Sequence, residues 1–218
     1  MGAGSTIRWQ GIPFLVLLWL LAVAAGSWAL ERYKAAAGAA KPISLQIVPA
    51  EHPLAESSQD FPRLVMFLHP HCPCSRSSLT ELKEILTRSP AVTAEIVLVK
   101  PPGTPDGWED TSLRRAAALL PHTQLTVDDG TRAQKLGAES SGHVVLFDPR
   151  GTACFSGGIP RSRGHAGESC GRRSILAILR GDVPEASTTS VFGCPLLAAD
   201  SCVSGGKCCE KSKDGSLQ

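Results

Sequence analysis

The sequence has little net charge and few aromatic residues. Its 218 residues include 22 basic and 20 acidic side chains, which gives a formal net charge of +2. The two signs are interspersed and no basic run is available to bind phosphates, so we expect no nucleic-acid partner. Aromatic residues make up only 5% of the chain, so a core must be built mainly from Leu, Val, Ile and Ala.

Motifs of several common enzyme classes are also missing. The chain has no internal repeat, no Gly-rich nucleotide loop, no hydrolase triad and no heme-attachment C-x-x-C-H motif. The P-x-x-x-[ST]-x-x-C pattern of peroxidases does not occur at the strand-to-helix turn that carries the first cysteines. These absences argue against nucleotide, heme and acyl-transfer chemistry, and the sequence predicts no cofactor.

Cysteine, by contrast, is abundant, with eight residues. Cys72 and Cys74 stand one residue apart. Two further cysteines are isolated and four crowd the C-terminal end: Cys154, Cys170, Cys194, Cys202, Cys208 and Cys209. An even number permits disulfides in an exported protein, with a connectivity that the sequence leaves open, whereas the same number in the cytosol would indicate metal binding or catalysis.

The N-terminal region contains a long uncharged run, residues 11–30. As a helix it spans roughly 30 Å, the thickness of the hydrocarbon core of a bilayer. Trp9 and Trp28 lie near its ends, where aromatic rings prefer the membrane interface. We predict an uncleaved transmembrane anchor after a short cytoplasmic segment, residues 1–10. Small residues in its second half leave a cleaved signal peptide as the alternative, and in both cases the chain beyond Leu30 is exported.

The exported part divides into three segments by composition. Residues 31–60 are rich in Ala, Pro, Ser and Glu and are typical of a tether, although residues 43–48 alternate like an edge strand. A folded domain is predicted over residues 61–185. Residues 186–218 form a cysteine-containing tail, which we expect to be disordered beyond about residue 197.

Within the predicted domain the elements run strand, helix, strand, helix, hairpin and helix. Short apolar runs predict strands buried on both faces, and Leu, Ile and Ala at helical spacing predict the helices. The ranges are strands 64–68, 95–99 and a short 125–127, a hairpin of 144–147 and 152–156, and helices after residue 75, from 110 or 111 to 120, and over 172–180. Parallel strands joined by crossover helices and followed by an antiparallel hairpin give an α/β sandwich, a central mixed sheet flanked by helices.

The segment His-Pro-His-Cys-Pro-Cys-Ser, residues 69–75, joins the first strand to the first helix. If Pro73 takes the first helical position, Cys72 becomes the N-cap, and the exposed N–H groups there lower the pKa of its thiol. Protonated histidines of the segment would lower it further, and the open turn should leave the thiol accessible. A capping box of Ser78 and Glu81 would start the helix later.

These residues resemble a known family. The strand at 64–68, the residue 69–75 turn and the following helix look like the active-site region of bacterial thioredoxin-like redoxins. Further stretches resemble the narrower, membrane-anchored RedB-like proteins: Phe155-Ser-Gly-Gly-Ile159, Arg163-Gly-His165, Gly167 and Val191-Phe-Gly-Cys-Pro-Leu196. The resemblance covers about residues 60–197. It implies a thioredoxin-like sandwich on a single-pass helix in the inner membrane, facing the periplasm or exterior.

The sequence departs from thioredoxins at two places. The pair is C-x-C without a preceding Trp, and residues 141–143, Ser-Gly-His, stand where thioredoxins carry a cis-proline. A C-x-C disulfide closes a small, strained ring that is easily reduced, which favours a disulfide donor, an isomerase or a sensor. The resemblance places His143 beside the cysteine pair and admits Cys194 as a resolving thiol.

Two functions fit these residues. The first is thiol–disulfide exchange on exported proteins with thiols or disulfides, with Cys72, Cys74 and His71 as candidate catalytic residues and His165 added by the resemblance. The alternative is a copper or other soft-metal binding protein, because imidazole and thiolate ligands suit such metals. Its candidate ligands are His69, His71, Cys72 and Cys74.

Overall fold

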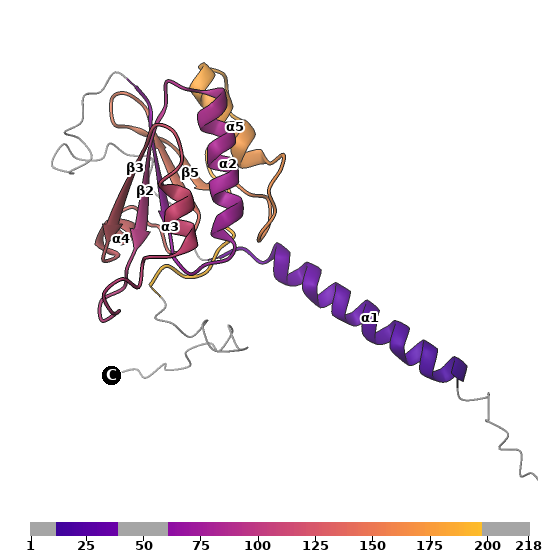
Figure 1. Ribbon diagram of the computed structural model, residues 1–218. Coiled ribbons are helices and arrows are strands. Elements are labelled where there is room, and N and C mark those ends of the chain that lie inside the picture. The colour runs from indigo at the N-terminus through magenta and orange to yellow at the C-terminus, as the bar shows by residue number, and fades with distance from the viewer. Residues whose placement is uncertain (1–11, 39–60, 198–218) are drawn as a thin grey trace, which may run out of the picture. The chain divides into compact units, whose positions relative to one another are not determined.

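The computed structural model describes residues 12–38 and 61–197, and the chain forms two units, Met1–Ala36 and Ala37–Gln218 (Figure 1). The first unit contains helix α1 (Ile12–Ala35), which is 24 residues long and apolar on all sides. Its mean hydropathy of 2.1 is high enough for a membrane span, and none of that stretch is buried within the protein. The predicted apolar helix is therefore present, and an anchor and a signal sequence both meet this description.

The second unit is a five-stranded sheet with helices on both faces. Its elements are β1 (Arg63–Leu68), α2 (Ser75–Arg88), β2 (Thr93–Val99), α3 (Ser112–Ala117), β3 (Thr123–Asp128), α4 (Thr131–Lys135), β4 (His143–Phe147), β5 (Ala153–Gly158) and α5 (Cys170–Arg180). The strand order is β3-β2-β1-β4-β5. Strands β1, β2 and β3 run parallel to one another, β4 runs antiparallel to β1, and β5 runs antiparallel to β4. The predicted mixed sheet is confirmed.

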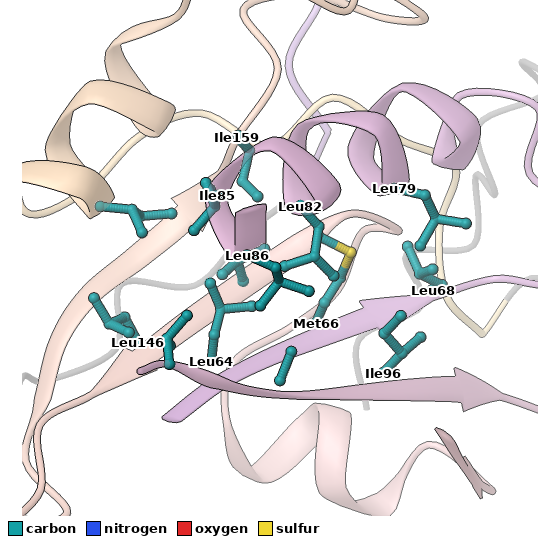
Figure 2. Close-up of a cluster of buried hydrophobic side chains, with 14 of the residues drawn as sticks. Leu64, Met66, Leu68, Leu79, Leu82, Ile85, Leu86, Ile96, Leu146 and Ile159 are labelled. Carbon is teal, nitrogen blue, oxygen red and sulfur yellow. The ribbon is translucent and has the colours of Figure 1, made fainter. Parts of the chain in front are cut away.

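Strand β1 lies at the centre of the sheet because its side chains are apolar on both faces. Leu64, Met66 and Leu68 alternate with Val65 and Phe67, and all five are completely buried. The first three pack against the apolar face of α2, as Figure 2 shows. The predicted strand buried on both faces is therefore confirmed, and it carries the chain directly into residues 69–75.

The two faces of the sheet are covered by different helices. One core cluster joins the sheet to α2, α3 and α5, and it includes Leu82, Leu113 and Ile175. The second cluster joins the opposite face to α4 and to Leu196 near the end of the described chain. A residue from outside the predicted domain thus completes this second layer.

Helices α3 and α4 differ from the prediction. Helix α3 ends at Ala117, three residues before the expected end, and α4 was not predicted. Helix α4 is only five residues long, too short to show a helical period, and the Asp128 carboxylate holds its start by accepting hydrogen bonds from the Gly130 and Arg132 N–H groups. The predicted strand at residues 43–48 lies outside the described residues.

Packed structure continues past the predicted domain end at residue 185. Ser156 of β5 pairs with Thr188 in a parallel bridge, and Ser140 pairs with Pro195 in an antiparallel one. Gly157 and Gly158 permit this approach, because a Cβ atom at either position would collide with residues 189 and 190. The segment 187–196 is therefore part of the folded unit, and the tail beyond residue 197 lies outside the described residues.

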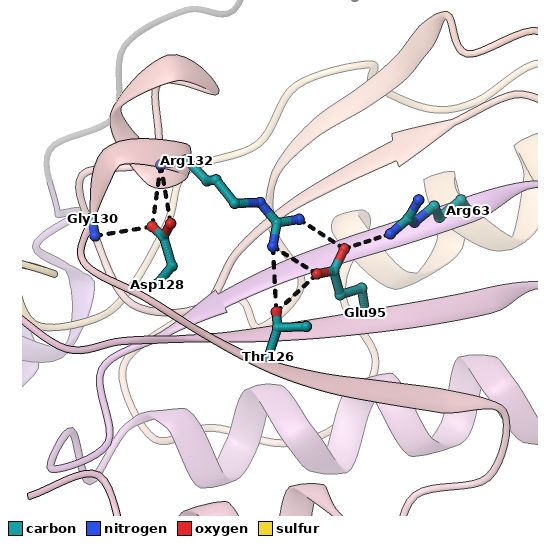
Figure 3. A network of polar contacts seen from close by, with 6 residues as sticks. All are labelled: Arg63, Glu95, Thr126, Asp128, Gly130 and Arg132. Atoms are coloured by element: carbon teal, nitrogen blue, oxygen red, sulfur yellow. Dashed lines mark hydrogen bonds and ion pairs between the residues drawn. The ribbon is translucent and has the colours of Figure 1, made fainter. Parts of the chain in front are cut away.

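A buried carboxylate on β2 is the centre of a polar cluster, shown in Figure 3. Glu95 is 3% exposed, and its oxygens accept hydrogen bonds from Arg63 at 2.6 Å and from Arg132 at 2.8 and 2.9 Å. Thr126 donates a further bond at 2.8 Å. This carboxylate cluster (Glu95, Arg63, Arg132 and Thr126) joins β1, β3 and α4 to strand β2.

Candidate functional site

The cysteine pair lies in a tight turn between β1 and α2. Ser75 N–H donates to the Cys72 carbonyl and Ser77 N–H donates to the Cys74 carbonyl, both at 3.2 Å. Helix α2 begins at Ser75, so Cys74, with helical backbone angles and no side-chain cap, is the N-cap. The predicted N-cap at Cys72 is therefore wrong, because the first turn closes two residues later.

The alternative capping box is not formed either. The Glu81 carboxylate lies 3.1 Å from the Arg172 guanidinium of α5 and accepts a 2.6 Å bond from Gly167 N–H. Glu81 is 1% exposed, so this contact joins α2 to α5 and to the Gly-rich loop before it. The signal at Ser78 and Glu81 reflects a tertiary ion pair, which sequence spacing alone does not distinguish from a cap.

Three cysteines meet at the end of β1, and we call Cys72, Cys74 and Cys194 the thiol cluster. Cys194 N–H donates to the Cys72 sulfur at 3.4 Å. Hydrogen bonds from the Cys194 thiol, and then from the Cys74 thiol, hold the pKa of Cys72 far below its usual value, against the opposing effect of burial. The predicted lowering of the pKa is present, but neighbouring thiols cause it.

The pKa of the Cys74 thiol is shifted in the opposite direction, upward. Its hydrogen bond to Cys72, its burial and the charge on Cys72 all raise the pKa of its thiol, while the charge of Arg163 lowers it. Arg163 also donates to the Gly193 carbonyl at 2.7 Å, so it connects Cys74 to the segment that carries Cys194. The two opposite directions favour the thiolate on Cys72 and the proton on Cys74.

Cys72 is not accessible in the way that the sequence suggested. Only 3% of its surface is exposed, whereas Cys74 and Cys194 are both partly exposed. Residues 191–196 and the loop before β4 cover the turn, and neither contact can be foreseen from residues 69–75 themselves. The accessible side of the cluster is formed by Cys74 and Cys194.

The loop before β4 occupies the place at which thioredoxins carry a cis-proline. Ser141 Oγ accepts from His69 N–H at 2.8 Å and lies 2.7 Å from Ser75 Oγ, so one hydroxyl joins both ends of the cysteine turn. Gly142 has a φ of +89°, and a Cβ atom there would meet Ser78 Oγ at 2.7 Å. The described residues contain no cis peptide, and Ser141 holds the turn by side-chain bonds instead.

Comparison with known proteins supports the fold. The sequence matches no protein-family model and no curated protein. A hypothetical protein from Sinorhizobium meliloti 1021 shares 17% identity at a TM-score of 0.53, covering 67% of this chain and 85% of the other. An uncharacterized conserved protein from Geobacillus kaustophilus shares 19% at 0.54, covering 66% and 80%. A thioredoxin-like protein from Aeropyrum pernix shares 16% at 0.41, covering 73% and 97%.

The fold is thioredoxin-like. Parallel β1, β2 and β3, the antiparallel β4 and β5, and the cysteine turn between β1 and α2 reproduce the arrangement that the sequence predicted. At these identities the likeness is one of fold. In this layout Ser141, far from the cysteine turn in sequence, lies beside His69 and Ser75 in space.

The two histidines of the cysteine turn pack on Trp108. Their rings lie 5.1 Å (His69) and 4.5 Å (His71) from the Trp108 ring. His71 Nε2 lies 2.8 Å from the Trp108 carbonyl, which only accepts, so this nitrogen carries a proton. His69 Nδ1 accepts from His71 N–H at 3.2 Å and carries none. The sequence analysis did not identify Trp108, although it is the only tryptophan after residue 28.

His143 and His165 are not brought to the cysteines. His143 Nε2 lies 2.9 Å from Ser156 Oγ within the sheet, and burial lowers the pKa of His143 to about 4. His165 sits in the loop before α5, where its N–H donates to the Ser162 carbonyl at 3.3 Å. Among the described residues no hydrogen bond joins either ring to the thiol cluster, so a role for either histidine in the chemistry of Cys72 stays a prediction.

The metal alternative finds no assembled ligand set in the described part of the chain. No group of three or more His, Cys, Asp and Glu side chains there is arranged to hold an ion. Of the four candidates, His69 and His71 hydrogen-bond within the turn and to Trp108, while the free thiols of Cys72 and Cys74 share a hydrogen bond. These residues as folded fit a thiol site better than a copper site.

Proposed function

We propose that this protein carries out thiol–disulfide exchange, with Cys72 as the attacking thiolate. The observation that carries the proposal is the set of hydrogen bonds that converge on Cys72 from Cys194 and Cys74. A thiolate is the nucleophile in disulfide exchange, and donors that stabilise it keep it ionised at neutral pH. The raised pKa of Cys74 favours its protonated form, which can protonate a leaving sulfur.

Membrane attachment and export belong to the same proposal. Helix α1 remains as a single-pass anchor in the inner membrane, with the thioredoxin-like unit in the periplasm or exterior and exported proteins with thiols or disulfides as partners. The length and hydropathy of α1 support this. The eight cysteines also support it, because disulfides form and persist in oxidising compartments outside the cytosol. A reporter fused after Gln218 should be active only outside the cytoplasm; cytoplasmic activity would contradict the topology, and release in soluble form would indicate cleavage.

The narrower likeness to RedB-like proteins is proposed as well. Two of the stretches that carry it lie in one packed region: residues 155–159 form the end of β5 and the residue after it, and residues 191–196 lie against the thiol cluster. Their joint packing gives both stretches a structural reason. The C-x-C spacing and the Ser141 loop favour a disulfide donor, an isomerase or a sensor over a thioredoxin-type reductant.

The exchange activity is tested with the purified full chain in detergent. Turnover is followed as reduction of glutathione disulfide by the reduced protein. Cys72→Ser should remove it, while Cys170→Ser, at a half-buried cysteine that faces Ser174 on α5, should not. Equal activity of both variants would refute the proposal, and stoichiometric copper or zinc that is lost on Cys72→Ser would favour the metal alternative.

A further inference from the structure

Residues 191–196 run alongside the cysteine turn and deliver a third thiol to it. Ser141 N–H donates to the Cys194 carbonyl at 2.8 Å, and Leu196 N–H donates to the Glu139 carbonyl at 2.9 Å. These bonds flank the bridge between Ser140 and Pro195. Because the loop before β4 also holds residues 69–75, it places Cys194 and Cys72 on a common support.

Gly193 shows how closely this segment fits the site. A Cβ atom at Gly193 would collide with the Ser141 carbonyl, so only glycine fits beside the loop. The Gly193 carbonyl accepts the 2.7 Å bond from Arg163, whose charge also acts on Cys74. Backbone bonds and a side-chain bond therefore fix Cys194 from both sides, with its N–H directed at the Cys72 sulfur.

We propose that Cys194 is the resolving thiol of this protein, and that its oxidised form carries a Cys72–Cys194 disulfide. The inference rests on the proposed exchange function and names the second step of that reaction. In this proposal the segment 191–196 supplies the second cysteine of the disulfide, whereas a reaction between Cys72 and Cys74 would need no third cysteine.

The two steps balance as an exchange of two electrons. The Cys72 thiolate attacks one sulfur of a substrate disulfide, forms a mixed disulfide and releases the other sulfur as a thiolate. That thiolate takes the proton of the Cys194 thiol, and the Cys194 sulfur then attacks Cys72 Sγ. A Cys72–Cys194 bond forms and the mixed disulfide breaks, so the protein's thiolate and thiol become a disulfide, and the substrate leaves as one thiol and one thiolate, which takes a proton from water.

The geometry favours Cys194 over Cys74 for this step. A bridge between Cys72 and Cys74 closes a ring that contains only Pro73, whose φ is fixed, at the point where α2 begins. Cys194 belongs to a separate segment and reaches Cys72 without disturbing the first turn of α2.

The test traps the mixed disulfide in the full chain. Reduced wild-type, Cys74→Ser, Cys194→Ser and, as a matched control from the same terminal region, Cys202→Ser proteins are treated with glutathione disulfide and mapped by mass spectrometry. We expect Cys194→Ser alone to accumulate glutathione on Cys72. Without the Cys194 thiol the mixed disulfide is not resolved, so the second glutathione is not released from this site. The other proteins should clear the adduct, and wild type should yield a Cys72–Cys194 cross-linked peptide.

The outcomes separate this inference from the proposed function. Accumulation in Cys74→Ser, together with a Cys72–Cys74 bridge in wild type, would make Cys74 the resolving thiol, overturn the inference and leave the exchange function intact. No glutathione on Cys72 in any variant would reject the exchange function itself. The wild-type disulfide map stands independently of how well the variants fold.

Discussion

The thiol cluster and the carboxylate cluster are both buried polar groups that carry negative charge, yet their partners differ. Glu95 is surrounded by the permanent cations of Arg63 and Arg132 (Figure 3). Burial alone would raise the pKa of Glu95, but bonds from Arg132 and Thr126 and the two charges lower it below its usual value. Cys72, by contrast, is held by neutral thiols that can themselves lose a proton.

The difference separates a structural ion cluster from a reactive one. In the carboxylate cluster the charge cannot move, because arginine does not deprotonate in proteins. In the thiol cluster the charge and the proton can be exchanged between three sulfurs, and each sulfur can form a covalent bond. Of these two buried charges, only the one on Cys72 therefore indicates reactivity, because its partners can both lose a proton and form a covalent bond.

Replacing the nucleophile should produce the largest contrast between the two clusters. Cys72→Ser should lower the exchange rate by at least about a hundredfold at pH 6.5. One of the remaining thiols would have to attack instead, and a thiol with the unperturbed pKa of about 8.5 is only about 1% ionised at that pH. Its unfolding free energy should fall below that of wild type only to the extent that the thiolate contributes at the pH used, since serine fills nearly the same volume but does not titrate. Stopped-flow exchange with glutathione disulfide measures the first quantity, and a rate unchanged within error would place the nucleophile elsewhere.

Replacing the carboxylate should reverse this pattern. Glu95→Gln leaves two arginines beside a neutral side chain, and removal of one partner from a buried ion pair costs about 3–5 kcal/mol of unfolding free energy. Glu84→Gln is the matched control, because Glu84 is half-exposed and its ion pair with Arg88 spans 3.5 Å, so its loss should cost under about 1 kcal/mol. Equal costs for both variants in urea titrations would show that the cluster is not structural.

The fold was largely predictable from the sequence because its strands are continuous apolar runs. Leu64 to Leu68 and Glu95 to Val99 have few other interpretations, and the turn at Asp148–Gly151 marks the hairpin. Helix α4 was missed because five residues carry no period. The packing of residues 187–196 was missed because it depends on Gly157 and Gly158 admitting a second backbone, which no local pattern reveals.

The site was predictable in its centre and not in its surroundings. The spacing of Cys72 and Cys74 identified the turn, but the leading donor to Cys72 is Cys194, which is distant in sequence and was suggested only by the family resemblance. Ser141 and Trp108 carry no motif that sets them apart, although each contacts the turn. Long-range contacts of this kind are properties of the fold, so only the three-dimensional arrangement shows them.

The third prediction removes a donor from the thiol cluster. Cys194→Ala deletes the thiol that contributes most to lowering the pKa of Cys72, while the backbone N–H remains. A hydrogen bond to a charged group contributes about 1.5–3 kcal/mol, so the pKa should rise by about one to two units. The midpoint of Cys72 alkylation by iodoacetamide against pH reports the shift independently of access. Cys154→Ala should leave it unchanged, because Cys154, whose own pKa is raised to about 11, bonds to the Leu146 carbonyl on β4.

The last prediction separates the two clusters by the pH at which each contributes to stability. Both groups have a pKa that is lowered by folding, so each adds stability above its unfolded pKa and loses it as the pH falls through the folded value. For Glu95 this loss lies below its ordinary value of 4.5. For Cys72 the unfolded thiol is protonated up to about pH 8.5, while the folded one is ionised, so unfolding takes up a proton throughout neutral pH.

The unfolding free energy of the reduced protein should therefore rise by up to about 1.4 kcal/mol per pH unit between pH 6 and 8. Urea titrations under a phosphine reductant measure this slope. Cys72→Ser should flatten it, because serine does not titrate, whereas Glu95→Gln should keep the neutral slope and lose stability dependence only in acid. A wild-type curve that is flat between pH 6 and 8 would mean that Cys72 is not held as a thiolate, and the contrast between the clusters would then reduce to one of geometry.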